Sequence, residues 1–144
     1  MPYSPLLVQP MRDELSMIGF EQLTTPEAVD QWMAAGEGTS LLVINSVCGC
    51  AAGMARPGVR LALEGGARPS RLGTVFAGQD VEATAKARGQ FPDIPPSSPS
   101  MALFKGGELV YFLPRHRIEG RGAEDVAADL RAAFEEHCGE ANQG

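Results

Sequence analysis

Cysteine, histidine and tryptophan are scarce in this chain of 144 residues, which has three cysteines, two histidines and one tryptophan. Three cysteines cannot form a disulfide scaffold, and an odd number leaves at least one free thiol, which a reducing compartment tolerates best. Apolar residues make up 44% of the chain and charged residues 21%, which is ordinary for a globular domain with its own core. We therefore expect residues 1–144 to form a single domain that folds without disulfides.

Long apolar runs and clusters of basic residues are also missing. No run reaches the length that a transmembrane helix needs, and residues 1–10 lack the basic and apolar regions of a secretory signal. The net charge of −6 and the scattered arginines argue against a nucleic-acid surface. We expect a cytoplasmic protein that has neither membrane nor nucleic acid among its partners.

Turn and cap residues divide the chain into helices and strands. Residues 41–44 form a continuous apolar run, which predicts a strand buried on both faces of a sheet. A Gly-Gly pair at 106–107 separates two apolar runs, which is the pattern of a β-hairpin. The expected helices cover 10–20, 26–35, 51–63, 81–88 and 123–138, and the expected strands cover 41–44, 72–77, 100–105 and 108–113.

Local signals place the starts of several helices. Pro10 is expected in the first turn of the first helix, and Asp80 is expected to cap the fourth. Pro57 predicts a kink or a late start in the third helix. The order of elements predicts an α/β fold, with a mixed four-stranded sheet flanked by helices. A helical extension over 1–38 precedes this sheet, and a frayed tail over 139–144 follows it.

Cys48 and Cys50 stand one residue apart where the buried strand gives way to a helix. A thiol at a helix N-terminus lies near unpaired N–H groups and the positive end of the dipole, which favour the thiolate. The second sulfur can resolve a mixed disulfide or supply half of a metal site. The chain offers three further soft or borderline ligands: His116, His137 and Cys138. Because these form no second close pair, redox chemistry is favoured, and a metal-carrier module that uses both cysteines is the alternative.

Two sets of motifs resemble known proteins. The cysteine pair together with residues 97–108 resembles thioredoxins, in which a cis-proline opens the strand before a Phe-Lys-x-Gly hairpin. Residues 45–53 (Asn-Ser-Val-Cys-Gly-Cys-Ala-Ala-Gly) and 74–80 (Thr-Val-Phe-Ala-Gly-Gln-Asp) resemble the bacilliredoxins, which are thioredoxin-fold proteins with a Cys-Gly-Cys centre. Residues 134–138 match as well, so the resemblance spans nearly the whole chain.

The bacilliredoxin resemblance implies a thiol–disulfide oxidoreductase that acts on proteins S-thiolated by bacillithiol, a small thiol of certain bacteria. Bacillithiol would be the thiol co-substrate, and the resemblance implies no other cofactor. Cys48 would be the nucleophile that takes up bacillithiol as a mixed disulfide. Cys50 or free bacillithiol would then discharge it. A protein disulfide isomerase with the same cysteine site is the alternative within this chemistry.

The resemblance also implies the residues that contact substrate. Pro99 would be cis, and the backbone of Ser98 would dock the substrate segment that carries the sulfur. Gly49 would lie against the substrate between the two sulfurs. Since bacillithiol carries malate carboxylates, positive charge is expected nearby, from Arg56 or from the cluster 115–117.

The single residue between the cysteines sets this chain apart from thioredoxins, as does Val47 in place of their tryptophan. A disulfide between Cys48 and Cys50 would close a smaller ring than a two-residue spacer allows, which strains its geometry and makes it easier to reduce. We predict a reduction potential more oxidising than that of thioredoxin, measurable by equilibrium titration against a thiol buffer. A thioredoxin-like potential would contradict this prediction.

Overall fold

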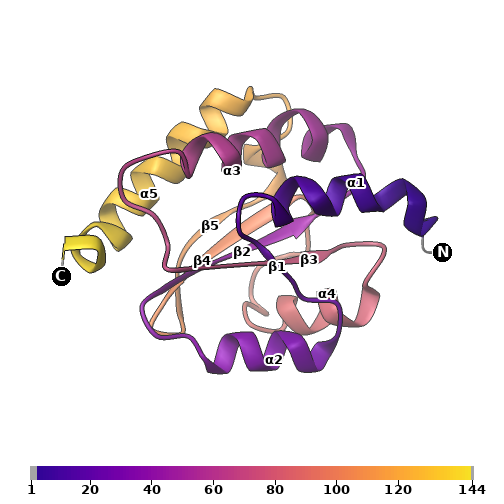
Figure 1. Cartoon of the computed structure of the whole chain (residues 1–144), viewed down its shortest axis with the longest axis horizontal. Coiled ribbons are helices and arrows are strands. Elements are labelled where there is room, and N and C mark those ends of the chain that lie inside the picture. Colours follow the sequence, from indigo (N-terminus) through magenta and orange to yellow (C-terminus); the bar gives the residue numbers. More distant parts are fainter. Residues whose placement is uncertain (1–2, 144) are drawn as a thin grey trace.

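A mixed five-stranded sheet lies between two layers of helices in the computed structural model, which describes residues 3–143 (Figure 1). The strand order is β1-β3-β2-β4-β5, in which β1, β3 and β2 are parallel and β4 and β5 continue antiparallel. The elements in chain order are α1 (Pro5–Ser16), β1 (Glu21–Gln22), α2 (Pro26–Ala34), β2 (Thr39–Asn45), the π-helical turn η1 (Ala51–Ala55), α3 (Arg56–Ala62), β3 (Arg71–Phe76), α4 (Val81–Arg88), β4 (Ser100–Lys105), β5 (Glu108–Leu113), the 3-10 turn η2 (Arg115–Arg117) and α5 (Ala123–Gln143).

The sheet has one strand more than the four predicted from the sequence. β1 pairs with β3 in parallel, with Glu21 opposite Gly73 and Gln22 opposite Thr74. A strand of two residues is too short for an alternating pattern to reveal it. The predicted α/β class and the other four strands are confirmed.

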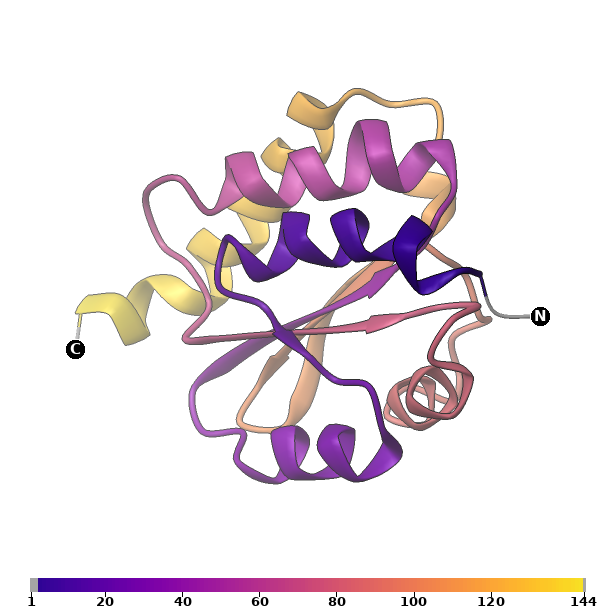
Figure 2. The same cartoon turned by 45° about the vertical axis from the view of Figure 1, so that its right-hand side comes forward.

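Helices cover both faces of the sheet, with α1, α3 and α5 on one face and α2 and α4 on the other (Figure 1, Figure 2). Leu41 and Val43 of β2 pack into the core under the first group. Leu42 and Ile44, which alternate with them, pack into the opposite core. The apolar run of the sequence is therefore buried on both faces, which confirms its prediction as a central strand.

Both ends of the chain differ from the predicted helix bounds. α1 begins at Pro5, where the Ser4 side chain accepts the N–H of Leu6, so Pro10 lies inside the helix rather than at its start. At the other end, α5 continues to Gln143 instead of ending at 138. The expected frayed tail over 139–144 is helical as far as the described residues reach, and Gly144 lies outside them.

Asp80 precedes α4 as predicted, but its carboxylate makes no cap hydrogen bond. It pairs instead with Arg12 of α1, with Oδ2 at 2.7 Å from Nη1. The same guanidinium lies 5.2 Å from the ring centre of Phe76, at the end of β3. Asp80 therefore links α1 to the end of the sheet, and its predicted role as a side-chain cap is wrong.

The helix after the cysteines changes its winding at Pro57. Its backbone is helical from Gly49, forms the π turn η1 and continues as α3 from Arg56. Pro57 has no N–H to donate to the carbonyl of Gly53, and the wider π turn precedes it. The predicted kink or late start is thus a π turn directly beside the cysteines.

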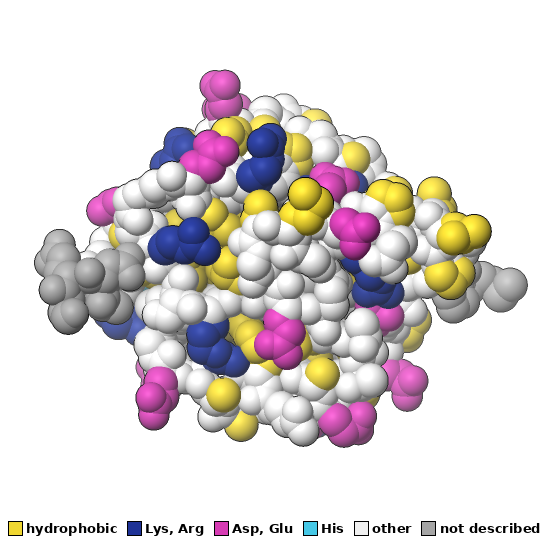
Figure 3. Space-filling model, viewed as in Figure 1, with side chains coloured by type: hydrophobic (Ala, Val, Ile, Leu, Met, Phe, Trp, Pro, Cys, Tyr) yellow, Lys and Arg dark blue, Asp and Glu magenta, His cyan; other side chains and the backbone are white. Residues whose placement is uncertain are grey.

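Charged side chains of both signs are spread over the face in Figure 3, where the described Lys and Arg residues form no continuous basic patch. Hydrophobic side chains are exposed between them. Among the large hydrophobic side chains, Leu6 in α1 and Met17 directly after α1 have the largest exposed fractions. Within residues 3–143, no helix has both the length and the apolar character that a membrane span requires.

Gly58 lets α3 approach α5 closely. A Cβ at this position would lie 2.6 Å from Cγ1 of Val126 and 3.1 Å from the carbonyl oxygen of Ala123. We expect Gly58→Ala to lower the free energy of unfolding by about 1–3 kcal/mol in denaturant titrations, because the two helices must separate. Gly139→Ala in α5 is the control, since a Cβ there meets no atom within 4 Å. Equal stability of the two variants would contradict this reading of the contact.

Candidate active site

Cys48 lies just after β2, directly before the helical backbone that starts at Gly49. Its carbonyl accepts the N–H groups of Ala51 at 3.1 Å and Ala52 at 3.2 Å, which closes the first helical turn. Cys48 and Cys50 are free thiols and both are partly exposed. Gly49 between them is exposed, and a Cβ there would meet no atom within 4 Å. Gly49 therefore places no side chain between the two sulfurs.

Hydrogen bonds distinguish the Cys48 thiol from an ordinary one. Burial acts to raise the pKa of Cys48, but bonds from the Ser46 hydroxyl, the Ala51 N–H, and the thiol and N–H of Cys50 lower the pKa overall. The Ser46 oxygen also accepts the N–H of Cys48 at 3.1 Å, so one side chain holds both the turn and the sulfur. These contacts favour the thiolate, which is the form that attacks disulfides.

Arg56 lies beneath this turn and is only 3% exposed. Its Nη1 donates to Asn45 Oδ1 at 2.9 Å and to the carbonyl of Ser46 at 2.8 Å. Asn45 Oδ1 also accepts the N–H of Ser46 at 2.9 Å, and a carboxylate oxygen of Glu14 lies 3.2 Å from Arg56 Nε. Arg56 is thus placed to support the turn, and not where the sequence placed it, beside an incoming carboxylate.

Ser98 and Pro99 form the neighbouring edge of the site. The peptide bond between them is cis, which is the isomer that the thioredoxin resemblance implies. Pro99 is buried and comes directly before β4, in which Ser100 pairs with Ile44 of β2. Because β2 also leads to Cys48, the cis-proline and the cysteine turn lie at the same edge of the sheet.

Arg115 bridges Cys50 and Ser98. Its Nη2 lies 3.6 Å from the Cys50 sulfur, and its Nη1 donates to the Ser98 carbonyl at 3.3 Å. Glu119 accepts from Arg115 Nη2 at 2.7 Å and Nε at 3.0 Å, and the same carboxylate oxygen lies 3.5 Å from the Cys50 sulfur. Burial and the hydrogen bonds with Cys48 and Glu119 raise the pKa of Cys50, although the charge of Arg115 acts in the opposite direction. The pKa of Cys48 is therefore lowered and the pKa of Cys50 is raised.

Ser46 and Glu119 belong to the site although neither was predicted as a functional residue. A serine two positions before a cysteine is the pattern of a side-chain turn, and Glu119 follows Arg115 at the spacing of a helical ion pair. Both patterns are common in proteins. They indicate a functional role only once the fold places Ser46 beside Cys48 and Glu119 beside Cys50.

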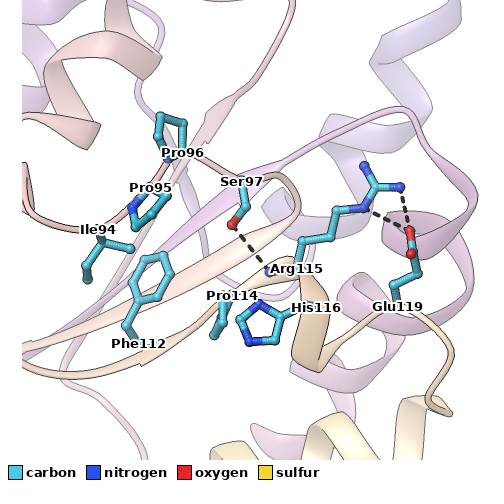
Figure 4. Close-up of a pocket in the computed structure, with 9 residues that line it drawn as sticks. All are labelled: Ile94, Pro95, Pro96, Ser97, Phe112, Pro114, Arg115, His116 and Glu119. Atoms are coloured by element: carbon cyan, nitrogen blue, oxygen red, sulfur yellow. Dashed lines mark hydrogen bonds and ion pairs between the residues drawn. The ribbon is translucent and has the colours of Figure 1, made fainter.

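A pocket of about 510 Å³ lies beside Arg115 and Glu119 (Figure 4). It is lined by Ile94, Pro95, Pro96, Ser97, Phe112, Pro114, Arg115, His116 and Glu119. One wall is apolar, and the other carries the polar side chains, where the Ser97 hydroxyl accepts the N–H of Arg115 at 3.3 Å. Arg115 and Glu119 line this pocket and also contact the Cys50 sulfur, so these two side chains stand between the pocket and the cysteine pair.

The remaining metal-ligand candidates do not gather around the cysteine pair. Cys138 is buried in the core with its neighbours from α3 and α5, and burial raises the pKa of its thiol although a hydrogen bond with Thr39 opposes this. His116 lines the pocket and His137 lies 3.5 Å from Glu136. Among residues 3–143, no three His, Cys, Asp or Glu side chains converge as a metal site requires.

We predict that Ser46→Ala raises the pKa of Cys48, because the variant removes one hydrogen bond to the thiolate. The pH midpoint for alkylation of Cys48 by iodoacetamide should move upward, and the rate at neutral pH should fall several-fold. Ser70→Ala, at an exposed position before β3, is the control and should keep the wild-type profile. An unchanged midpoint in Ser46→Ala would show that the hydroxyl does not govern this thiol.

Comparisons with known proteins match this arrangement. Residues 3–138 match the family described as disulphide isomerase. The bacilliredoxin of Shouchella clausii is 56% identical over 136 residues, which cover 94% of each chain. The bacilliredoxin of Cytophaga hutchinsonii is 56% identical over 134 residues, which cover 93% of this chain and 98% of that protein.

A solved structure supports the same fold. The thioredoxin of Fasciola hepatica aligns with 82% of this chain and 99% of its own, with a TM-score of 0.58 and 20% sequence identity. At this identity the likeness shows a thioredoxin fold and no more. The relatives at 56% identity and the family match over residues 3–138 show that the chain belongs to the bacilliredoxins and is a thiol–disulfide oxidoreductase.

Proposed function

We propose that this protein removes bacillithiol from S-bacillithiolated proteins, with Cys48 as the attacking thiolate. The observation that carries the proposal is the contrast between two thiols one residue apart. Hydrogen bonds outweigh burial and lower the pKa of Cys48, whereas burial and hydrogen bonds with Cys48 and Glu119 raise the pKa of Cys50. The name of the relatives at 56% identity supports bacillithiol as the small thiol involved.

The first chemical step is an exchange at sulfur. The Cys48 thiolate attacks the bacillithiol sulfur of the modified client, and the bond between client sulfur and bacillithiol sulfur breaks. The client leaves as a thiolate and takes a proton from solvent, while bacillithiol stays on Cys48 as a mixed disulfide. No cofactor is needed, because one disulfide is exchanged for another.

The second step frees the enzyme by one of two routes. If Cys50 attacks Cys48, bacillithiol leaves as a thiol and an internal disulfide forms, which a cellular reductant must then reopen. If a second bacillithiol attacks the bound one, bacillithiol disulfide leaves and Cys48 returns to the thiolate. Cys50 is the resolving residue of the first route. Burial and its hydrogen bonds with Cys48 and Glu119 raise its pKa, so little of the attacking thiolate is present at neutral pH.

Substrate docking uses the edge formed by Ser98 and the cis-bonded Pro99. The Ser98 carbonyl can accept a backbone N–H of the client once Arg115 turns away from it. Arg115 and His116, from the predicted cluster 115–117, line the pocket and offer donors to the malate carboxylates of bacillithiol, the role for which Arg56 was the other candidate. Gly49 leaves room for the client beside the sulfurs.

A disulfide isomerase is the second candidate, favoured by the description of the matching family. The same Cys48 thiolate would attack a client disulfide and release one client thiolate. A different thiolate of that client would then attack the mixed disulfide, which forms a new client disulfide and frees Cys48. The two candidates differ in the bond that Cys48 breaks first, and a substrate with only one modified cysteine separates them.

Mass spectrometry after incubation with a singly bacillithiolated client tests the proposal. We expect Cys50→Ser to accumulate bacillithiol on Cys48, because its internal resolving thiol is gone. Cys48→Ser should carry none and should release the client thiol only at the uncatalysed rate. Equal release by wild type and Cys48→Ser would refute the proposed role. Activity on a client with non-native disulfides, without release of bacillithiol, would favour the isomerase.

A further inference from the structure

Cys50 contacts two charged side chains that the first exchange step does not use. Arg115 Nη2 lies 3.6 Å from the Cys50 sulfur and Glu119 Oε2 lies 3.5 Å from it. The two charged groups are also bonded to each other at 2.7 Å. A thiol, a carboxylate and a guanidinium thus form a closed triangle at the second cysteine.

The backbone that carries the two charged groups is anchored on both sides. The N–H of Arg115 is held by the Ser97 hydroxyl, and the carbonyl of Arg115 accepts the N–H groups of Ile118 and Glu119, each at 2.8 Å. Ile118 is fully buried in the core. The triangle is therefore built on a fixed turn, although the Arg115 and Glu119 side chains themselves are partly exposed.

We propose that Glu119 is a positioning residue that delays Cys50, by accepting its S–H and holding it as a thiol beside the more reactive Cys48. This inference rests on the proposed function in one respect: it assigns Cys50 the resolving role. The delay has a purpose in that scheme. While Cys48 carries the bound thiol, a reactive Cys50 thiolate would displace that thiol and close the internal disulfide, and Cys48 would not return as a thiolate until a reductant reopened the bond.

The resolving step balances with solvent as the proton carrier. Cys50 gives its proton to solvent, the Cys50 sulfur attacks the Cys48 sulfur, and the bond between Cys48 and the bound thiol breaks. The leaving thiolate takes up a proton from solvent, so no further reactant is required. Hydrogen bonds from Arg115 and Cys50 lower the pKa of Glu119, which makes the carboxylate a weak base that holds the S–H of Cys50 as a hydrogen-bond donor instead of taking its proton.

The charges that act on Cys50 come from two segments. Cys48 faces it from its own turn, and Arg115 and Glu119 face it from the segment after β5. Arg115 favours the Cys50 thiolate, whereas Cys48 and Glu119 oppose it. Replacing the Glu119 carboxylate alone is therefore expected to lower the pKa of Cys50, so that the Cys50 thiolate forms at a lower pH.

Stopped-flow reaction of the full chain with dithiodipyridine tests the role of Glu119. The chain carries Cys138→Ala so that only the two site thiols report. A first release of thiopyridone marks attack by Cys48, and a second marks its displacement by Cys50, which Cys50→Ser removes. In Glu119→Gln we expect the second phase to be roughly two- to tenfold faster, with its pH midpoint lowered.

Glu124→Gln is the matched control, since this exposed carboxylate in the first turn of α5 has the same charge. It should keep the wild-type second phase and pH midpoint. A second phase in Glu119→Gln that is unchanged or slower would overturn the proposal, as would the absence of a Cys50-dependent phase in wild type. Because the probe contains no bacillithiol, failure of the bacillithiol proposal would be seen in the client experiment and not in this one.

Discussion

The hydrogen bonds that Arg56 donates from beneath the strand-to-helix turn are the interaction on which the rest of the site depends. A buried guanidinium is costly unless it is paired, and here Nη1 donates to Asn45 and Ser46 while the Glu14 carboxylate lies 3.2 Å from Nε as an ion pair. Asn45 ends β2 and Arg56 begins α3, so the same contacts join the central strand to the helix behind the cysteines. Ser46 is thereby fixed where its hydroxyl meets Cys48.

Two chemically identical thiols are made different by what surrounds them. Backbone N–H groups and a hydroxyl surround Cys48 and favour its negative charge, whereas Cys50 faces a carboxylate. The contrast arises because the first sulfur lies inside the turn and the second points toward the segment after β5. In this chain, a spacer of one residue thus separates two electrostatic environments as well as two sulfurs.

The sequence predicted what depends on neighbouring residues and missed what depends on distant ones. The apolar run of β2, the glycine hairpin and the cysteine pair are local patterns, and their elements lie where they were expected. The partnership of Asp80 with Arg12 joins residues 68 apart, and no local pattern reports it. Arg56 was one candidate for binding the carboxylates of bacillithiol, because the sequence shows the charge of an arginine near a thiol. The sequence does not show that this arginine is buried. Glu119 acts on a sulfur 69 positions away.

α1 also reaches the underside of the cysteine turn, through the Met11 carbonyl that accepts the Asn45 amide at 3.3 Å and through Glu14 beside Arg56. The helix that precedes the first strand therefore supports the candidate active site and is not a separate appendage. During evolution, substitutions in α1 offer a way to retune the reactivity of the thiol while the Cys-Gly-Cys segment itself stays untouched.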